Sequence, residues 1–195
     1  MLVSLGHVHT TNAAALVSSN ATSSAIVESN GNSKRSSISN DGEIIAFSSG
    51  ATNLTSDNDT NGVDDVFVYQ RSTGFITRIT DDTAICSAGG PVVSGDGKYV
   101  TYSQCYKVYR YTVATGDTEL VTYNGFAPDI SDNGQYIVYH NNQSGLGNPM
   151  DVFRKDMVNN TTILVSVSPA GTDVAGRYSI YPSISADGNK VAFEN

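Results

Sequence analysis

The chain has 195 residues, of which 19 are acidic and 11 are basic, so its formal net charge at pH 7 is −8. This length corresponds to one domain or two small ones. The acidic balance argues against a nucleic-acid partner, because binding phosphate requires clustered Lys and Arg. With 39% hydrophobic and 15% charged residues, the composition is not that of a disordered chain. No apolar run reaches the roughly 20 residues of a membrane span, and no stretch has the pattern of a signal peptide, so we expect neither a membrane span nor a signal peptide in this chain.

A short signature occurs four times along the chain. Each copy has a β-branched residue, Ser, two further residues and Gly, at positions 38–42, 93–97, 130–134 and 184–188. Pro precedes three copies at the same offset (Pro91, Pro128 and Pro182), and Ser36 takes that place in the first. Each Gly is followed by a β-branched, small and aromatic run, which is typical of a buried strand. Because Asp-Gly and Asn-Gly favour tight turns, each signature predicts a β-hairpin.

A second hairpin is predicted downstream of the first in three of the units. One strand begins at Val66, Val108 or Val152, and the next ends 13 residues later at Ile79, Val121 or Val165. The fourth copy is matched instead at the start of the chain, where Leu16-Val17-Ser18 resembles Leu164-Val165-Ser166. The N-terminal and C-terminal strands are therefore expected to share one four-stranded unit.

Four strands in each of four repeats predict an all-β fold, a β-propeller of four four-stranded blades in a single domain spanning 1–195. We expect blades at about 36–80, 91–122 and 128–166, and a split blade made of 1–18 and 182–195. This split blade would be completed within one chain or, in a dimer, by the partner chain. Closing the ring in either way removes the open sheet edges that promote aggregation.

The repeat resembles that of the TolB-like β-propellers. The resemblance rests on Ser37-Ile38-Ser39-Asn40-Asp41-Gly42, Ile45-Ala46-Phe47-Ser48, Asp65-Val66-Phe67-Val68-Tyr69 and Thr77-Arg78-Ile79-Thr80, with counterparts in the other units. It implies a bacterial interaction scaffold in the periplasm or outside the cell. Rings of this family usually have six or more blades. Three closures therefore stay open: a four-bladed ring, an eight-bladed ring of two chains, or part of a larger propeller.

Function is expected on the face that carries the loops between the second and third strands and between successive blades, because binding residues concentrate on loops. Long loops in the first and third units, at 50–64 and 141–150, would border a groove lined by Asp and Asn. Such a groove favours cations, sugars or polar peptide groups. The candidate ligand-binding residues on this face are Asn141, Asn142, Tyr178 and Tyr181.

A candidate calcium site lies in the first of these loops. Asp57, Asp59, Asn61 and Asp65 match positions 1, 3, 5 and 9 of a calcium-binding loop, with Gly at position 6. The twelfth position is Val68 instead of the usual Glu. The alternative is an Asx-rich turn whose side chains bind their own backbone.

The two cysteines, Cys86 and Cys105, flank one predicted hairpin at similar distances from its turn. Antiparallel pairing would place them close together. The pattern is equally consistent with a disulfide, which would indicate an oxidising compartment, and with two buried thiols.

The leading functional hypothesis is a non-enzymatic scaffold that binds a protein or a polar ligand through its loop face. One alternative is an enzyme that acts on carbohydrate as a lyase or glycosidase at the channel mouth. This alternative requires converging carboxylates or a metal, for example on His7, His9 and His140. The other alternative is a purely structural module.

Overall fold

The computed structural model describes residues 19–20, 27–57, 59–141, 150–168 and 178–195. Three four-stranded antiparallel sheets, here called blades 1 to 3, follow one another along the chain. Blade 1 contains β3 (Ser33–Ile38), β4 (Ile44–Ser49), β5 (Asp65–Gln70) and β6 (Phe75–Arg78). Blade 2 contains β7 (Ala88–Val93), β8 (Tyr99–Gln104), β9 (Lys107–Thr112) and β10 (Thr118–Tyr123). Blade 3 contains β11 (Gly125–Ile130), β12 (Tyr136–Asn141), β13 (Asp151–Asp156) and β14 (Thr161–Leu164).

Two shorter sheets complete the described structure. A hairpin of β15 (Ile180–Ile184) and β16 (Val191–Glu194) repeats the first two strands of a blade, and β1 (Ser19–Asn20) pairs with β2 (Val27–Glu28). The prediction of an all-β fold made of four-stranded units is therefore confirmed. Residues 1–18, the predicted other half of the split blade, lie outside the described residues. In the described part, no helix has the length and apolarity needed to cross a membrane.

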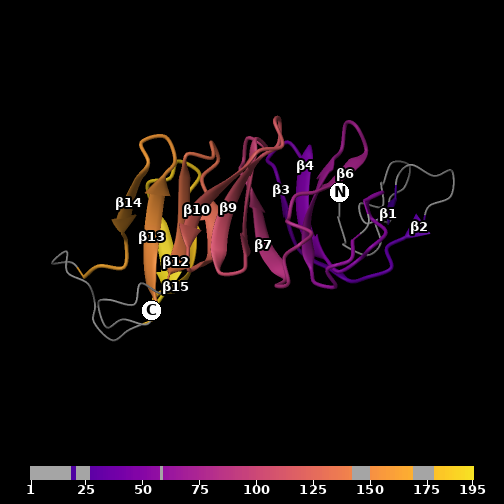
Figure 1. Ribbon diagram of the computed structural model, residues 1–195. Helices are drawn as coiled ribbons and strands as arrows, with labels where there is room; N and C mark the ends of the chain where they lie inside the picture. Colours follow the sequence, from indigo (N-terminus) through magenta and orange to yellow (C-terminus); the bar gives the residue numbers. More distant parts are fainter. Residues whose placement is uncertain (1–18, 21–26, 58, 142–149, 169–177) are drawn as a thin grey trace.

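The blades stand side by side in chain order (Figure 1). The first strand of each blade packs against the preceding blade: β7 contacts β3 and β4, β11 contacts β7 and β8, and β15 contacts β11 and β12. These inner strands follow one another along one side of the row. Blade 1 and the β15–β16 hairpin lie toward opposite ends, so the described sheets form an open row instead of a closed ring.

Each inner strand carries a bulge at the same repeat position. The residue there has a left-handed backbone, with φ of 53° at Arg35, 63° at Gly90, 42° at Ala127 and 50° at Tyr181. The pairing register shifts directly around each of them. Proline follows in three of the four strands, and it is tolerated there because a bulge interrupts the hydrogen-bond ladder.

The repeated signature forms a hydrogen-bonded turn between the first two strands. The Ser39 hydroxyl donates to Asp41 Oδ1 (2.6 Å), which also accepts the Glu43 N–H (2.9 Å), and Ser39 Oγ accepts the Ile44 N–H (3.0 Å). Gly42 completes the turn with a φ of 70°. The other three copies have the same bonds, with Asn133 in place of Asp in the third. This network explains why Ser, Asp or Asn, and Gly recur.

The same turns also join neighbouring blades. The Asn40 N–H donates to the Gly95 carbonyl (3.0 Å), the Asp96 N–H to Asp132 (2.9 Å) and the Asp132 N–H to Ala186 (2.9 Å). One backbone bond thus connects each turn to the next along the row.

An aromatic ring covers the turn glycine of the next blade. In blade 2, Arg110 lies over the Tyr99 ring (4.5 Å to its centroid) and donates to the Gly134 carbonyl of blade 3 (2.8 Å). The Tyr99 ring lies where a Cβ at position 134 would stand. In blade 3, Arg154 lies over the Tyr136 ring (4.7 Å to its centroid) and donates to the Gly188 carbonyl (2.7 Å). The Tyr136 ring lies where a Cβ at position 188 would stand. Only glycine leaves room for the ring, which fixes the stacking of successive blades.

The hydrophobic core lies between and within the blades. The cluster joining blades 1 and 2 includes Ala46, Val66 and Val100, each fully buried. The Tyr102 ring, 2% exposed, belongs to this cluster and its hydroxyl donates to the Ile79 carbonyl (3.0 Å). Tyr139, 3% exposed, packs in the next cluster. Both belong to the aromatic positions of the repeated runs that the sequence indicates as buried strands.

The contact between ring and glycine can be tested by comparing two substitutions. Gly74 has a φ of 73° and would meet nothing within 4 Å on gaining a Cβ. We expect Gly74→Ala to lower the free energy of unfolding by about 1–2 kcal/mol, the cost of a left-handed backbone. Gly134→Ala should cost about 1–3 kcal/mol more, because Tyr99 must also move. Urea denaturation measures both, and equal losses would contradict the packing role of Tyr99.

Candidate functional site

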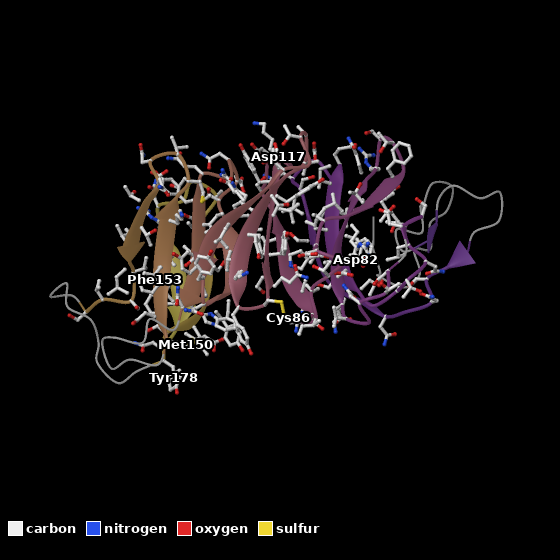
Figure 2. The ribbon with its side chains drawn as sticks, in the orientation of Figure 1. Asp82, Cys86, Asp117, Met150, Phe153 and Tyr178 are labelled. Atoms are coloured by element: carbon white, nitrogen blue, oxygen red, sulfur yellow. A yellow bond between two sulfur atoms is a disulfide. The ribbon has the colours of Figure 1, made fainter. Side chains whose placement is uncertain are left out.

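The connections between strands gather at two opposite ends of the blades. Figure 2 places Cys86, Met150 and Tyr178 at one end and Asp117 at the other. The first end carries the connections from β4 to β5, from β8 to β9 and between successive blades, and is here called the loop face. In blade 2 the connection from β8 to β9 is only Cys105-Tyr106. Residues 142–149, which connect β12 and β13, lie outside the described residues.

A groove follows the bulges of the four inner strands. Its volume is about 380 Å³, and it is lined by residues 35–36, 90–92, 127–129 and 181–183. This central groove differs from the predicted one, which was to be lined by Asp and Asn. Its walls are mostly apolar because Pro91, Pro128 and Pro182, which follow the left-handed residues, line it.

Two charged side chains line the central groove. Asp129 Oδ2 accepts hydrogen bonds from the Ser183 hydroxyl (2.9 Å) and the Ile184 N–H (2.8 Å), so this carboxylate joins blade 3 to β15. The Arg35 guanidinium lies against Gly89, in the space that a Cβ there would fill. Among the described residues, the groove therefore holds one carboxylate, and that carboxylate is already hydrogen-bonded.

Four aromatic side chains form a continuous row on the loop face. Tyr106 meets Phe126 edge to face, Phe126 stacks on His140, and His140 meets Tyr181 edge to face, with centroid distances of 5.6, 5.6 and 5.7 Å. The end rings face solvent: Tyr106 is 68% exposed and Tyr181 is 60% exposed. Tyr181 also lines the central groove. This aromatic row therefore crosses from blade 2 to β15 and adjoins the groove.

His140 is the buried member of the aromatic row. Its Nδ1 accepts the Tyr181 N–H at 3.3 Å. Burial lowers the pKa of His140, which favours the neutral ring. A neutral ring with Nδ1 as acceptor carries its proton on Nε2, which is therefore a donor. His7 and His9, which were considered with His140 as metal ligands, lie outside the described residues.

A disulfide holds the Tyr106 end of the row. Cys86, before β7, is bonded to Cys105, and their Cα atoms are 5.5 Å apart. Cys105 and Tyr106 both have left-handed backbones, with φ of 50° and 61°, as a two-residue hairpin turn of this kind requires. The Tyr106 carbonyl accepts the Gly125 N–H (3.1 Å). The turn is thus fixed to the segment before β7 and to the first residue of β11.

The four predicted ligand-binding residues lie in different environments. Asn141 is buried, and its Nδ2 donates to the Tyr123 carbonyl (2.9 Å) and Thr122 Oγ1 (3.3 Å), so its amide joins blades 2 and 3. Asn142 lies outside the described residues. Tyr178 and Tyr181 are both more than half exposed on the loop face. Whether any of them binds a ligand stays a prediction.

Sequence reasoning missed Tyr106 and the stacking role of His140. Tyr106 follows Cys105 directly in the shortest connection of the loop face, and a ring in a two-residue turn projects from the blade. The place of Tyr106 in this short turn is the feature of the sequence that could have identified it as an exposed ring. No comparable signal exists for His140, because its contact with Phe126 depends on the pairing of β11 with β12.

The predicted calcium ligand Asp65 is part of the blade itself. It is fully buried, and its Oδ1 accepts the Thr80 hydroxyl (2.6 Å), while Thr80 Oγ1 accepts the Val66 N–H (3.2 Å). Asp151 and Ser166 repeat this arrangement in blade 3. Burial raises the pKa of Asp65. Asp65 and Asp151, at the start of the third strand of their blades, therefore hold the residues that follow the fourth strand by hydrogen bonds to Thr80 and Ser166.

A buried arginine stands among the acidic residues of the predicted calcium loop. Arg78 Nη1 lies 2.8 Å from Asp82, 3.6 Å from Asp59 and 3.8 Å from Asp65. Asn61 turns its amide N–H toward Asp65 Oδ2 (3.2 Å), and Asp57 is exposed. Within the described ranges, no group of three His, Cys, Asp or Glu side chains is arranged to hold a metal. The geometry favours the structural alternative, and calcium binding stays a prediction that calorimetric titration with Ca²⁺ tests.

Comparison with solved structures places this architecture among β-propellers. TolB from Acinetobacter baumannii superposes with a TM-score of 0.59 and 18% identity, over 86% of this chain and 38% of that one. The tricorn protease superposes with a TM-score of 0.56 and 15% identity, over 78% of this chain and 14% of that one. Oligogalacturonate lyase from Vibrio parahaemolyticus superposes with a TM-score of 0.56 and 13% identity, over 82% of this chain and 44% of that one. The fold is that of the TolB-like β-propellers.

These likenesses concern the fold alone. The chain spans 38%, 14% and 44% of the lengths of those three proteins. No protein-family model and no curated protein matches the sequence. The expected resemblance to TolB-like propellers is confirmed at the level of structure, while activity and partners must be argued from the site itself.

The arginine cluster provides a test of the structural role of the acidic loop. Arg78→Ala leaves Asp59 and Asp65 buried without their cation, so we expect a loss of about 3–5 kcal/mol in unfolding free energy at pH 7. Burial already raises the pKa of Asp65 and the Arg78 guanidinium lowers it, so without Arg78 the folded-state pKa of Asp65 rises further. The loss should therefore shrink as the pH falls toward 4 and Asp65 takes up a proton.

The matched control for this test is Arg71→Ala. Arg71 pairs with Glu43 at 3.7 Å on the surface, and its side chain is 55% exposed. A surface pair of this kind is worth about 0–1 kcal/mol, so this variant should unfold almost as the wild type does. Urea denaturation at pH 7 and pH 4.5 measures both variants. Equal losses in the two variants, or a loss for Arg78→Ala that does not depend on pH, would contradict the role given to Arg78.

Proposed function

We propose that this protein is a non-enzymatic β-propeller scaffold that binds a protein or a polar ligand through its loop face. The observation that carries the proposal is the aromatic row beside the central groove, with Tyr106 and Tyr181 exposed at its ends. Exposed tyrosines on a fixed backbone are suited to binding, because they offer a large contact area and lose little conformational entropy. The adjoining groove adds a concave surface of the kind that ligands occupy.

The geometry gives less support to catalysis. Hydrolysis or elimination at a sugar needs a pair of acid and base groups, or a metal, at one place. In the described part of the groove, Asp129 is the one carboxylate, and hydrogen bonds from Ser183 and Ile184 hold it in place. The likeness to oligogalacturonate lyase concerns the fold and supplies no such pair.

For the closure of the ring, we propose an eight-bladed assembly of two chains. Two features support pairing with further blades. The described sheets form an open row (Figure 1), and among the described residues the ladder of turn hydrogen bonds runs from Asn40 to Ala186 without closing on itself. Gly42, the turn glycine of blade 1, is covered by no ring from a preceding blade in the described part. A second copy would supply that cover.

Binding through the loop face is tested with a double variant, Tyr106→Ala with Tyr181→Ala. Wild-type protein is screened by NMR against a panel of short peptides and oligosaccharides, and each hit is then measured on the variant. We expect hits to weaken by about tenfold or more, because each stacked ring is worth about 1 kcal/mol. Phe75→Ala is the control, since Phe75 is 64% exposed on the turn between β5 and β6 at the opposite end. Hits that bind both variants equally would place binding elsewhere.

The proposed assembly predicts the mass of the protein in solution. Size-exclusion chromatography with light scattering should give twice the chain mass of 20.6 kDa. A mass equal to one chain at micromolar concentration would contradict an eight-bladed dimer. This outcome would leave the binding proposal unchanged, since the aromatic row and the groove come from one chain.

A further inference from the structure

We propose that the aromatic row is a stacking platform for a neutral glycan, bound by the non-polar faces of successive pyranose rings. This inference rests on the proposed ligand-binding function and names its ligand class. The platform consists of Tyr106, Phe126, His140 and Tyr181, which come from the β8–β9 turn, β11, β12 and β15. It is a different surface from the loops in which the sequence suggested a cation site.

The platform presents more than one ring to a ligand. Tyr106 is 68% exposed, Tyr181 is 60% exposed and Phe126 is half-buried, while His140 lies buried between Phe126 and Tyr181. Successive centroids along the row are 5.6, 5.6 and 5.7 Å apart. A linear oligosaccharide can use separated exposed rings, since each pyranose presents a face of C–H groups that can lie on a ring. A compact small molecule would use only one of them.

The platform also provides polar groups where sugar hydroxyls would lie. The hydroxyls of Tyr106 and Tyr181 are on exposed side chains and act as donors or acceptors. Sugars need this combination of apolar faces and neutral hydrogen-bonding groups, since their own hydroxyls must exchange water for a partner.

The charges favour a neutral sugar over an acidic one. The chain carries a net charge of −8, which repels polyanions at long range. Of the basic residues near the platform, Lys107 lies over the exposed Tyr123 ring, 5.8 Å from its centroid. Arg35 lines the adjoining groove and lies against Gly89.

The backbone around the platform is fixed before a ligand arrives. The Cys86–Cys105 disulfide and the Gly125 N–H hold the turn that carries Tyr106. Tyr181 has a left-handed φ of 50° and a hydrogen bond from its N–H to His140. Preorganised rings limit the entropy cost of binding, which matters for a shallow surface that gains little free energy from buried area.

The test uses cellohexaose, maltohexaose and chitohexaose as neutral probes, hexagalacturonate as an acidic probe and a proline-rich decapeptide as a protein-like probe. We expect at least one neutral hexasaccharide to bind with a Kd of about 0.1–1 mM, as fits a shallow site. Tyr106→Ala and Tyr181→Ala should each weaken this binding by about tenfold, as expected for one lost stacking contact. Phe75→Ala should leave it unchanged. The Cys86→Ser, Cys105→Ser double variant should weaken it severalfold while its circular dichroism spectrum stays that of the wild type.

The other outcomes separate the glycan inference from the proposed function. Failure of all three neutral probes to bind, or equal binding to the tyrosine variants and the wild type, overturns the inference. If the decapeptide alone binds through the two tyrosines, the glycan inference is wrong and the scaffold function stands. If hexagalacturonate binds best and Arg35→Gln abolishes that binding, the ligand is an acidic sugar held in the groove, which also overturns the inference. If no probe binds, the glycan inference fails and the scaffold function loses its present support.

Discussion

The structure depends on how one blade fits the turn of the next. Tyr99 and Tyr136 each lie over a glycine with a left-handed backbone, and Arg110 and Arg154 fasten that contact to the glycine carbonyl. A Cβ on the glycine would occupy the position of the ring, so the blades can approach this closely only where the turn residue is glycine. The contact recurs from blade 2 to blade 3 and from blade 3 to the β15–β16 hairpin, while Ile44 lies against Gly97 between blades 1 and 2. These contacts between turns bring the inner strands of successive blades to one side. The central groove is a consequence of that convergence.

The same repeat distributes the chemistry of the chain between its two ends. The Ser-x-Asp-Gly turns lie at the end opposite the loop face, and they use their carboxylates to bind their own backbone. The Ser185 hydroxyl and the Asn189 N–H lower the pKa of Asp187 to about 2, and the Ser39 hydroxyl and the Glu43 N–H lower that of Asp41. The carboxylates of Asp41, Asp96 and Asp187 are therefore structural, and they lie away from the aromatic row.

The sequence is informative wherever one residue type has one local task. Gly42, Gly97, Gly134 and Gly188 were recognised as turn residues because each follows Asp or Asn and precedes a buried strand. Tyr102 and Tyr139 follow the turn glycines at one fixed offset, and both are buried. Asp65 and Asp151 likewise recur at the start of the third strand, and their hydrogen bonds to Thr80 and Ser166 give this repeat a structural role.

The sequence is less informative where a feature depends on residues from several blades. The left-handed backbone of Ala127 and Tyr181 has no local signal, since neither is Gly or Asn, and it becomes apparent only with the shift in strand pairing. Arg78 enters the acidic loop from β6, so the spacing of Asp57, Asp59 and Asn61 suggested an ion although the structure already provides a cation. A local motif indicates which charges gather, but the tertiary pairing decides what neutralises them.

The aromatic row shows how a functional surface can arise from this arrangement without a motif of its own. Each of its rings occupies an ordinary repeat position: a hairpin turn, the residue before a bulge, a strand end and the bulge itself. The contact between blades brings successive ring centroids within 6 Å of one another, and the disulfide fixes the turn that carries Tyr106 at one end of the row. Substituting the rings should therefore change what the protein binds while leaving the blade contacts intact, because the rings on the turn glycines, Tyr99 and Tyr136, belong to the opposite end.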